Sequence, residues 1–269
     1  MQHANLDGLR IGYHVAGERG DNVLLIMGFT MAGRVWVHQW PTLAETCQVA
    51  FFDNRGVGAS DRPRGLYTMQ QMARDTIGLL DHLGWQRAHV VGVSMGGMIA
   101  QHLALAAPQR VNTLSLIATT AGGPTAALPT RNGLINFLKA QAGDRTKRLK
   151  ALEKLLFPQP FRDSCDEGWM ADVMAHDFLV EPAPLATRRS QLAAVFRHDV
   201  RKMLPKSPGV QAIPTLIVRP GLDELVAPRE SDRLAALLPH ADVLRLDDAG
   251  HGAIRQCKDR VNDALLKHF

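Results

Sequence analysis

The stretch from Ala88 to Ala107, AHVVGVSMGGMIAQHLALAA, constrains the fold more than any other part of the chain. It opens with a valine-rich run, residues 89–93, which is typical of a strand buried on both faces of a parallel sheet. From Met95 onward apolar residues recur at helical spacing, which indicates a helix that packs back on that sheet. Glycines at the junction let the strand and the helix pass close together, where a Cβ would clash. The stretch therefore predicts a strand, a sharp turn with Ser94 at its tip, and a helix.

The turn itself, residues 92–96, fits the G-x-S-x-G nucleophile elbow, in which strained backbone angles push a serine hydroxyl out above the sheet. Ser94 would stand at a helix N-terminus, where N–H groups and the helix dipole favour negative charge. The Met95 N–H would point to the place where an oxyanion forms. A Gly-rich connection with an incidental serine is the alternative, and the flanking strand and helix favour the nucleophile.

The composition excludes several classes of protein. The chain has 269 residues, 46% of them hydrophobic and 21% charged, which suffices for a sizeable core. The formal charge of +5 comes without a long basic run, so we expect no nucleic-acid binding. No apolar stretch is long enough to span a bilayer, and the first residues lack the pattern of a secretory leader. We therefore expect no membrane association.

The three cysteines, Cys47, Cys165 and Cys257, lie far apart and show no metal-ligand spacing. Three is also an odd number, so they do not form a complete set of disulfide pairs. They are best interpreted as reduced thiols of a cytoplasmic protein, packed as small apolar side chains.

Strand and helix patterns alternate along most of the chain, which predicts βαβ units and a mostly parallel central sheet flanked by helices. The expected strands are residues 10–16, 23–27, 48–52, 89–93, 111–118, 214–219 and 242–246. Between the strands at 111–118 and 214–219 the alternation stops, and helical patterns follow one another at 134–141, 146–156, 166–178 and 187–198. We therefore expect an α/β core formed by residues 1–120 and 209–269, with an inserted helical cap at 121–208.

A serine hydroxyl is a poor nucleophile at neutral pH, so Ser94 requires a base, and the base requires an acid that fixes its tautomer. Both should lie on loops at the carboxyl edge of the sheet. Asp223 follows the strand at 214–219, and His251 stands between two glycines after the strand at 242–246. The order Ser, Asp, His is the one expected with a G-x-S-x-G turn. Two alternatives stay open, Glu224 as the acid and a helix-capping role for Asp223.

These motifs resemble the α/β-hydrolase superfamily, and the resemblance covers essentially the whole chain except the cap. It is carried by MGF at 27–29, DNRGVGASDRP at 53–63, VGVSMGG at 91–97, GLDELVAP at 221–228 and AGHG at 249–252. The resemblance implies an oxyanion hole made by the backbone N–H groups of Phe29 and Met95. The family usually has His-Gly-X where this chain has Met27-Gly28-Phe29. Phe29 can still donate with Met27 in place of the histidine, because the donor is the Phe29 backbone N–H.

The substrate pocket is the least constrained part of the prediction. Gly28, Phe137, Trp169 and His198 are the candidate substrate-binding residues, because an apolar cap can bury a hydrophobic acyl or alcohol group. Each candidate has an alternative role. Gly28 could simply form a turn, the aromatic residues could hold the cap together, and His198 could make a structural hydrogen bond.

The sequence thus predicts a serine hydrolase that cleaves carboxylic esters or lactones of small to medium hydrophobic molecules through Ser94, His251, Asp223 and an acyl-enzyme. No metal ion or organic cofactor is implied, and we expect a monomer or homodimer whose partner is the small-molecule substrate. A C–C bond hydrolase of a ring-cleavage diketone is the first alternative, because fold alone does not set the reaction. A receptor of the same fold that binds a small ligand without turnover is the second.

Overall fold

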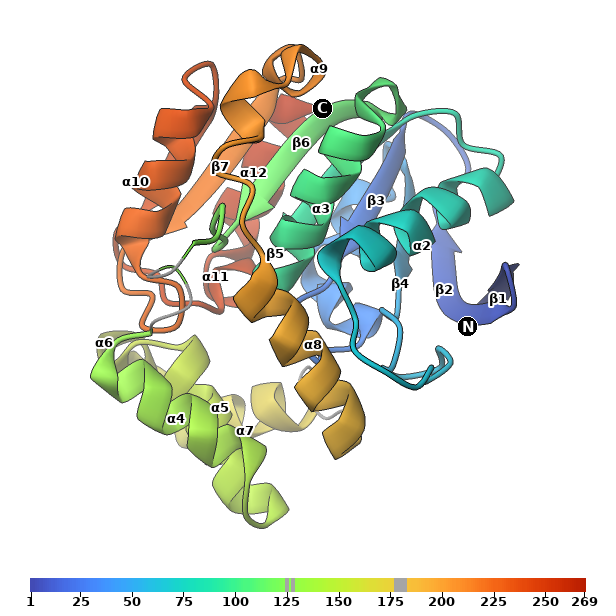
Figure 1. Ribbon diagram of the computed structural model, residues 1–269. Coiled ribbons are helices and arrows are strands. Elements are labelled where there is room, and N and C mark those ends of the chain that lie inside the picture. The colour runs from blue at the N-terminus through green and yellow to red at the C-terminus, as the bar shows by residue number, and fades with distance from the viewer. Residues whose placement is uncertain (124–125, 127–128, 177–182) are drawn as a thin grey trace.

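The computed structural model describes residues 1–123, 126, 129–176 and 183–269 (Figure 1). At its centre lies an eight-stranded sheet of order β1-β2-β4-β3-β5-β6-β7-β8. The strands are β1 (Gln2–Leu6), β2 (Leu9–Ala16), β3 (Asn22–Ile26), β4 (Gln48–Phe52), β5 (Ala88–Val93), β6 (Val111–Ile117), β7 (Thr215–Pro220) and β8 (Asp242–Leu246). The β1–β2 and β2–β4 pairs are antiparallel, and every other pair is parallel. The prediction of a mostly parallel sheet is confirmed.

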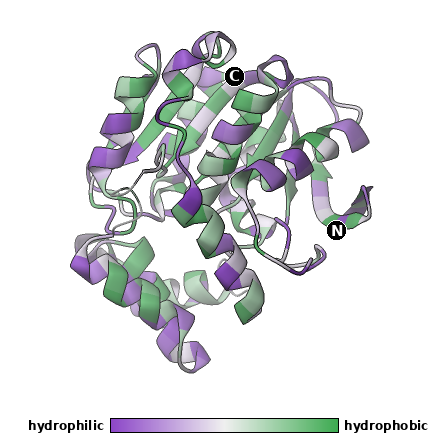
Figure 2. Ribbon diagram, in the orientation of Figure 1, coloured by the Kyte–Doolittle hydropathy of each residue, from purple (hydrophilic) through white to green (hydrophobic). Residues whose placement is uncertain are grey.

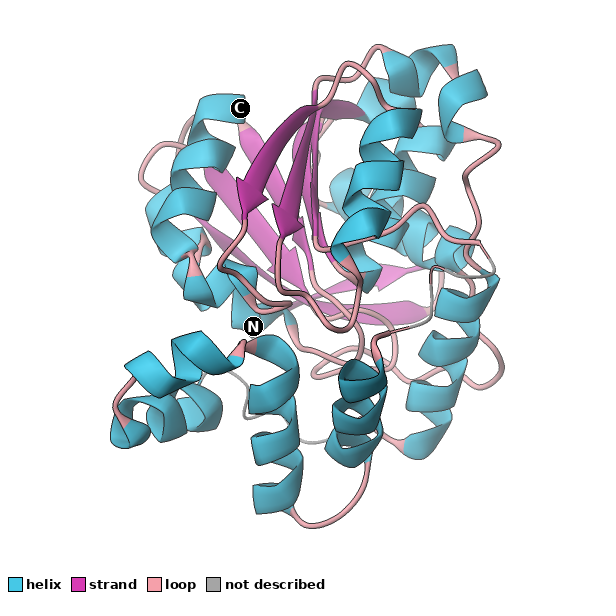
Figure 3. Cartoon of the chain, turned by 90° about the vertical axis from the view of Figure 1, so that its left-hand side faces the viewer, coloured by secondary structure: helices cyan, strands magenta, loops and turns pink. Residues whose placement is uncertain are grey.

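Helices cover both faces of the sheet (Figure 3). One layer contains α2 (Met69–His82), α3 (Met95–Ala106) and α10 (Pro228–Leu237), and the other contains η1 (Gly33–His38), α1 (Trp40–Leu43), α11 (Ala253–Gln256) and α12 (Lys258–His268). A short turn of helix, η2 (Pro108–Arg110), leads from α3 into β6. Two hydrophobic clusters fill the space between the sheet and these layers.

Strand β3 shows why the central strands are continuously apolar. Leu24 and Ile26 belong to one cluster, Val23 and Leu25 belong to the other, and all four are fully buried. Successive side chains of a strand point to opposite faces, so a strand covered on both faces has no polar positions. The central strands are accordingly mostly green in Figure 2, and the outer faces of the helices carry the hydrophilic residues.

Strand β1 is not among the strands expected from the sequence. Leu6 pairs with Leu9 across a two-residue turn whose residues, Asp7 and Gly8, have φ angles of 51° and 85°. Positive φ at both positions is the type I′ hairpin turn, for which Asp-Gly is a preferred sequence. A local signal for this hairpin was therefore present, and β1 itself is too polar to show a strand pattern.

Five helices between β6 and β7 gather at the carboxyl edge of the sheet (Figure 1). They are α4 (Arg131–Gln141), α5 (Arg145–Leu156), α6 (Gln159–Ser164), α7 (Glu167–His176) and α8 (Leu185–Arg197). The short helices η3 (Leu204–Lys206) and α9 (Pro208–Gln211) follow, and α9 lies at the opposite edge, where β7 begins. The four predicted helical segments correspond to α4, α5, α7 and α8, and residues 177–178 of the third prediction lie outside the described residues. The outgoing and returning chains meet where Gly122 pairs with Asp199 in an isolated bridge. Within the described ranges, every helix is too short or too polar to cross a membrane.

Candidate active site

Ser94 occupies the predicted turn between β5 and α3 in a strained conformation. Its φ and ψ are 55° and −122°, a combination that costs a non-glycine residue about 1–3 kcal/mol and persists only where surrounding contacts impose it. The Ser94 N–H donates to the Ile117 carbonyl at 2.9 Å, and the Thr119 hydroxyl donates to the Ser94 carbonyl at 2.7 Å. The neighbouring strand β6 and the loop after it therefore hold this backbone in place.

Two glycines make the turn possible. A Cβ on Gly96 would lie 2.0 Å from the Ile26 carbonyl oxygen, and a Cβ on Gly92 would lie 2.4 Å from the Gly96 carbonyl oxygen. Backbone atoms cannot yield at such distances, so any larger residue at either position would displace the strand or the helix. The glycines of the motif thus bring α3 directly against β3 and β5.

Asp223 and His251 come together at the carboxyl ends of β7 and β8. Asp223 Oδ2 lies 2.7 Å from His251 Nδ1, and the two residues are buried. The other oxygen, Oδ1, accepts the backbone N–H groups of Leu225 and Val226 at 2.8 and 2.9 Å. Because a carboxylate only accepts, the His251 proton is placed on Nδ1, which leaves Nε2 as an acceptor.

Glu224 has a different structural role. Its carbonyl oxygen accepts the Thr130 N–H at 2.9 Å and lies against Gly133, so its backbone supports the beginning of α4. His251 pairs with Asp223 and not with this neighbour.

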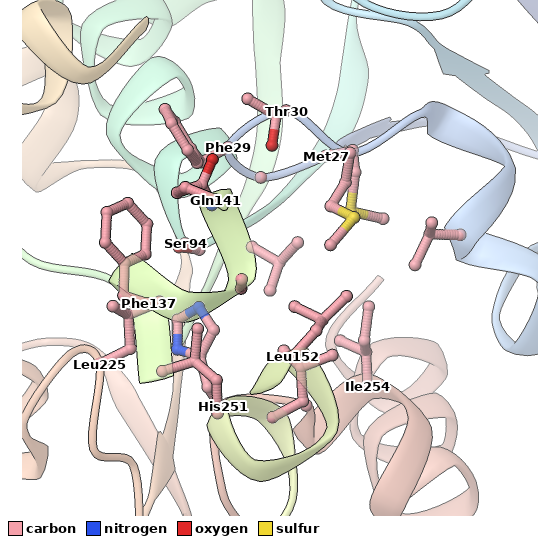
Figure 4. A pocket seen from close by; sticks show the side chains of 18 residues that line it. Met27, Phe29, Thr30, Ser94, Phe137, Gln141, Leu152, Leu225, His251 and Ile254 are labelled. Atoms are coloured by element: carbon pink, nitrogen blue, oxygen red, sulfur yellow. The ribbon is translucent and has the colours of Figure 1, made fainter. Parts of the chain in front are cut away.

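Ser94 and His251 line one pocket between the sheet edge and the helices α4 and α5 (Figure 4). The inward face of α4 contributes Phe137, Ala140 and Gln141, and that of α5 contributes Leu152, Leu155 and Leu156. The remaining described residues that line it are Met27, Gly28, Phe29, Thr30, Met31, Val35, Val93, Leu225, Gly252 and Ile254. The two helices expose one face each to the pocket, because the lining positions recur at the 3–4-residue spacing of a helix.

The predicted oxyanion residues flank Ser94. Phe29 lies in the loop after β3, where it contacts Phe137 with ring centroids 5.7 Å apart, and Met95 is the first residue of α3. A Cβ on Gly28 would lie 3.3 Å from Ser94 Cβ, so a glycine is what allows this loop to approach the serine closely. Phe29 therefore directly follows a residue that approaches Ser94, and Met95 directly follows Ser94 itself.

Trp169 and His198 are not among the described residues that line this pocket. Trp169 on α7 packs edge-on against Phe161, and the Arg255 guanidinium lies 5.0 Å from its ring centroid. His198 lies at the end of α8, buried against His102, at the place where the cap returns to the core. No local pattern distinguishes such packing from a position in the pocket.

His102 and His198 form a buried pair with a defined donor sequence. His198 Nε2 donates to the Thr120 carbonyl at 3.1 Å, so its Nδ1 accepts from His102 Nε2 at 3.2 Å. Burial lowers the pKa of both histidines to about 4, and the neighbouring His102 contributes to the lowered pKa of His198. The nearest carboxylate on the same loop, Asp199, is engaged by Arg201 at 2.8 Å.

This pair predicts a loss of stability in acid. The unfolded chain takes up protons on these histidines near pH 6.5, whereas the folded protein resists protonation until about pH 4. The stability that the two neutral histidines give the folded protein is therefore fully present above pH 6.5 and is lost as the pH falls towards 4. We expect the melting temperature to fall across this window, and less steeply in a His102→Gln/His198→Gln double variant. A surface variant, His3→Gln, is the control, and equal slopes for all three proteins would contradict the prediction.

Two residues of the DNRGVG segment support the loop after β3 through contacts that the sequence did not specify. Asn54 Nδ2 donates to the Met27 carbonyl at 2.8 Å, and Asp53 Oδ1 accepts the Gly33 N–H at 2.7 Å. Both residues are buried and belong to the DNRGVG motif, whose position after a strand was the available signal. Within the described part of the chain, no cluster of His, Cys, Asp and Glu could hold a metal ion.

Comparison with known proteins now identifies the family. The family model described as "alpha/beta hydrolase fold" matches residues 21–254, so the chain belongs to the α/β-hydrolase family. It is 32% identical over 256 residues to the Mycobacterium tuberculosis protein named "Putative non-heme bromoperoxidase BpoC", covering 93% of this chain and 94% of that protein. It is 30% identical over 263 residues to the Caulobacter segnis protein named "Putative carbamate hydrolase RutD", covering 95% of this chain and 93% of that one.

Among solved structures, the enol-lactonase from Burkholderia xenovorans superposes with a TM-score of 0.84 at 24% identity, covering 99% of each chain. At this identity the likeness shows the fold alone. The agreement extends over the whole chain, so the α/β-hydrolase fold expected from the motifs is confirmed.

Proposed function

We propose that this protein is a serine hydrolase that cleaves neutral, hydrophobic carboxylic esters or lactones. The observation that carries the proposal is that Ser94 and the paired imidazole of His251 open into one pocket whose other walls are almost entirely apolar. An acyl-transfer site requires these parts together: a nucleophile, a base oriented by an acid, and a cavity that excludes water.

The geometry supports a two-step reaction. Ser94 Oγ attacks the substrate carbonyl carbon while His251 Nε2 takes the hydroxyl proton, and the N–H groups of Phe29 and Met95 stabilise the oxyanion. The intermediate collapses, His251 gives the proton to the leaving alcohol, and an acyl group remains on Ser94. Water, deprotonated by His251, then attacks the acyl carbon. The bond to Ser94 Oγ breaks, His251 returns the proton to Ser94, and the acid is released.

The lining of the pocket favours a neutral substrate. Of the described residues that line it, His251 is the one with a titratable side chain, and neither Lys nor Arg is present. The acids produced by oxidative ring cleavage carry a carboxylate, which would be buried here without a cationic partner at a cost of several kcal/mol. This observation favours an ester or lactone over the C–C cleavage alternative. Hydrophobic groups of the substrate would lie against α4 and α5.

We also propose that the protein acts in the cytoplasm. All three cysteines, Cys47, Cys165 and Cys257, are free thiols. Free thiols fit a reducing compartment such as the cytoplasm.

The test is hydrolysis of p-nitrophenyl esters of increasing acyl length, with a lactone, a carbamate and a ring-cleavage dienoic acid in parallel. We expect turnover of esters with a maximum at one acyl length, because the walls of the pocket limit the chain that fits. Preferred turnover of the carbamate or of the dienoic acid would contradict the substrate assignment. Thermal stabilisation by these compounds without any turnover would instead indicate a receptor.

A further inference from the structure

Gln191 links the cap to the loop that carries the proposed oxyanion donor. It lies on α8, is completely buried, and reaches across to the core. Its Oε1 accepts the Thr30 N–H at 2.8 Å, and its Nε2 donates to the Arg55 carbonyl at 3.1 Å. Both ends of the side-chain amide are therefore used, and its orientation is determined.

The residue that Gln191 holds is strained. Thr30 has a φ of 55°, a left-handed conformation that is rare for a β-branched residue. It directly follows Phe29, and both residues line the pocket beside Ser94 (Figure 4). A backbone in such a conformation needs external contacts to keep it, and the bond from Gln191 is one of them.

The other end of Gln191 is anchored on a rigid segment. The Arg55 guanidinium makes two bonds of 2.6 Å to the carboxylate of Asp75 on α2, and both side chains are largely buried. Next to Gln191, Ser190 Oγ donates to the Gly65 carbonyl at 2.7 Å. Helix α8 is thus fixed to the core at two adjacent positions, of which Gln191 alone also holds the loop after β3.

We propose that Gln191 is a positioning residue: it holds Thr30 so that the Phe29 N–H points to the oxyanion formed at Ser94. The inference rests on the proposed function. Oxyanion stabilisation then depends on the position of α8 against the core. A residue of the inserted helices thus controls the orientation of a hydrogen-bond donor in the core. The substrate itself need not contact Gln191.

The experiment compares Gln191→Met, which keeps the volume but removes both bonds, with Ser190→Ala, which removes a neighbouring bond that does not reach the loop. We expect Gln191→Met to lower kcat for a p-nitrophenyl ester about 10- to 100-fold, with KM nearly unchanged, because a misaimed donor acts on the transition state. Ser190→Ala should leave kcat within about twofold. Both are measured well below their melting temperatures.

A second readout does not depend on ester turnover. A fluorophosphonate forms a bond from Ser94 Oγ to phosphorus with loss of fluoride, while His251 takes the proton and the phosphoryl oxygen uses the oxyanion hole. The labelling rate should fall in Gln191→Met in parallel with kcat. If this variant lowers only the melting temperature and leaves kcat and the labelling rate unchanged, the proposal is overturned. If the wild type is labelled at Ser94 but hydrolyses no ester, the proposed function fails, and the ratio of labelling rates still decides the role of Gln191.

Discussion

Replacing Asp223 with asparagine is expected to lower kcat by about 10⁴-fold without unfolding the protein. In the native protein Oδ1 accepts two backbone N–H groups, from Leu225 and Val226, so an asparagine must place its oxygen there. Its amide nitrogen would then face His251 Nδ1 and donate to it. The His251 proton would move to Nε2, where it blocks acceptance of the Ser94 proton.

Glu224→Gln is the matched control for this prediction. Glu224 is the neighbouring carboxylate, and its backbone supports the beginning of α4 without bonding His251. We expect this variant to retain kcat within a few-fold and to melt near the wild-type temperature. If Glu224→Gln lost activity while Asp223→Asn stayed active, Glu224 would be the acid, and the assignment of Asp223 would be wrong.

Replacing Ser94 with alanine should remove activity even more completely, by about 10⁶-fold in kcat, because no other group can form the acyl-enzyme. The turn imposes the strained φ of 55° at this position, and the hydroxyl does not cause it. We therefore expect little change in the melting temperature. Steady-state ester kinetics together with thermal melting would separate the two effects. Hydrolysis that persists in Ser94→Ala, beyond the rate of buffer, would contradict a serine mechanism.

The fold was predictable wherever the sequence carries a strong local pattern. The expected strands at 48–52 and 242–246 coincide with β4 and β8. Thr68 caps α2 through reciprocal bonds with Gln71, and a threonine three residues before a glutamine is a local signal for such a cap. These elements have apolar runs or capping residues that act over a few positions. The polar strand β1 has no such run, and its signal lay only in the Asp7-Gly8 turn.

The residues of the candidate site also differ in how far the sequence predicts them. Ser94, Asp223 and His251 stand in short Gly-rich motifs after strands, and the topology of a parallel sheet brings such loops to one edge. The pocket walls depend on how α4 and α5 pack, and their apolar positions look the same in sequence whether they face a pocket or a core. Gln191 meets Thr30 across 161 residues of sequence, so nothing near either residue indicates the contact. Long-range polar contacts of this kind require the structure.

The most direct test of the central claim is reaction of the purified protein with a fluorophosphonate, followed by intact mass and peptide mapping. Its outcome does not depend on the identity of the natural substrate. We predict one adduct per chain, located on Ser94, and strongly slowed labelling in Asp223→Asn because His251 then cannot accept the proton. An unmodified protein, or an adduct on another residue with Ser94 left free, would contradict the assignment of Ser94 as an activated nucleophile.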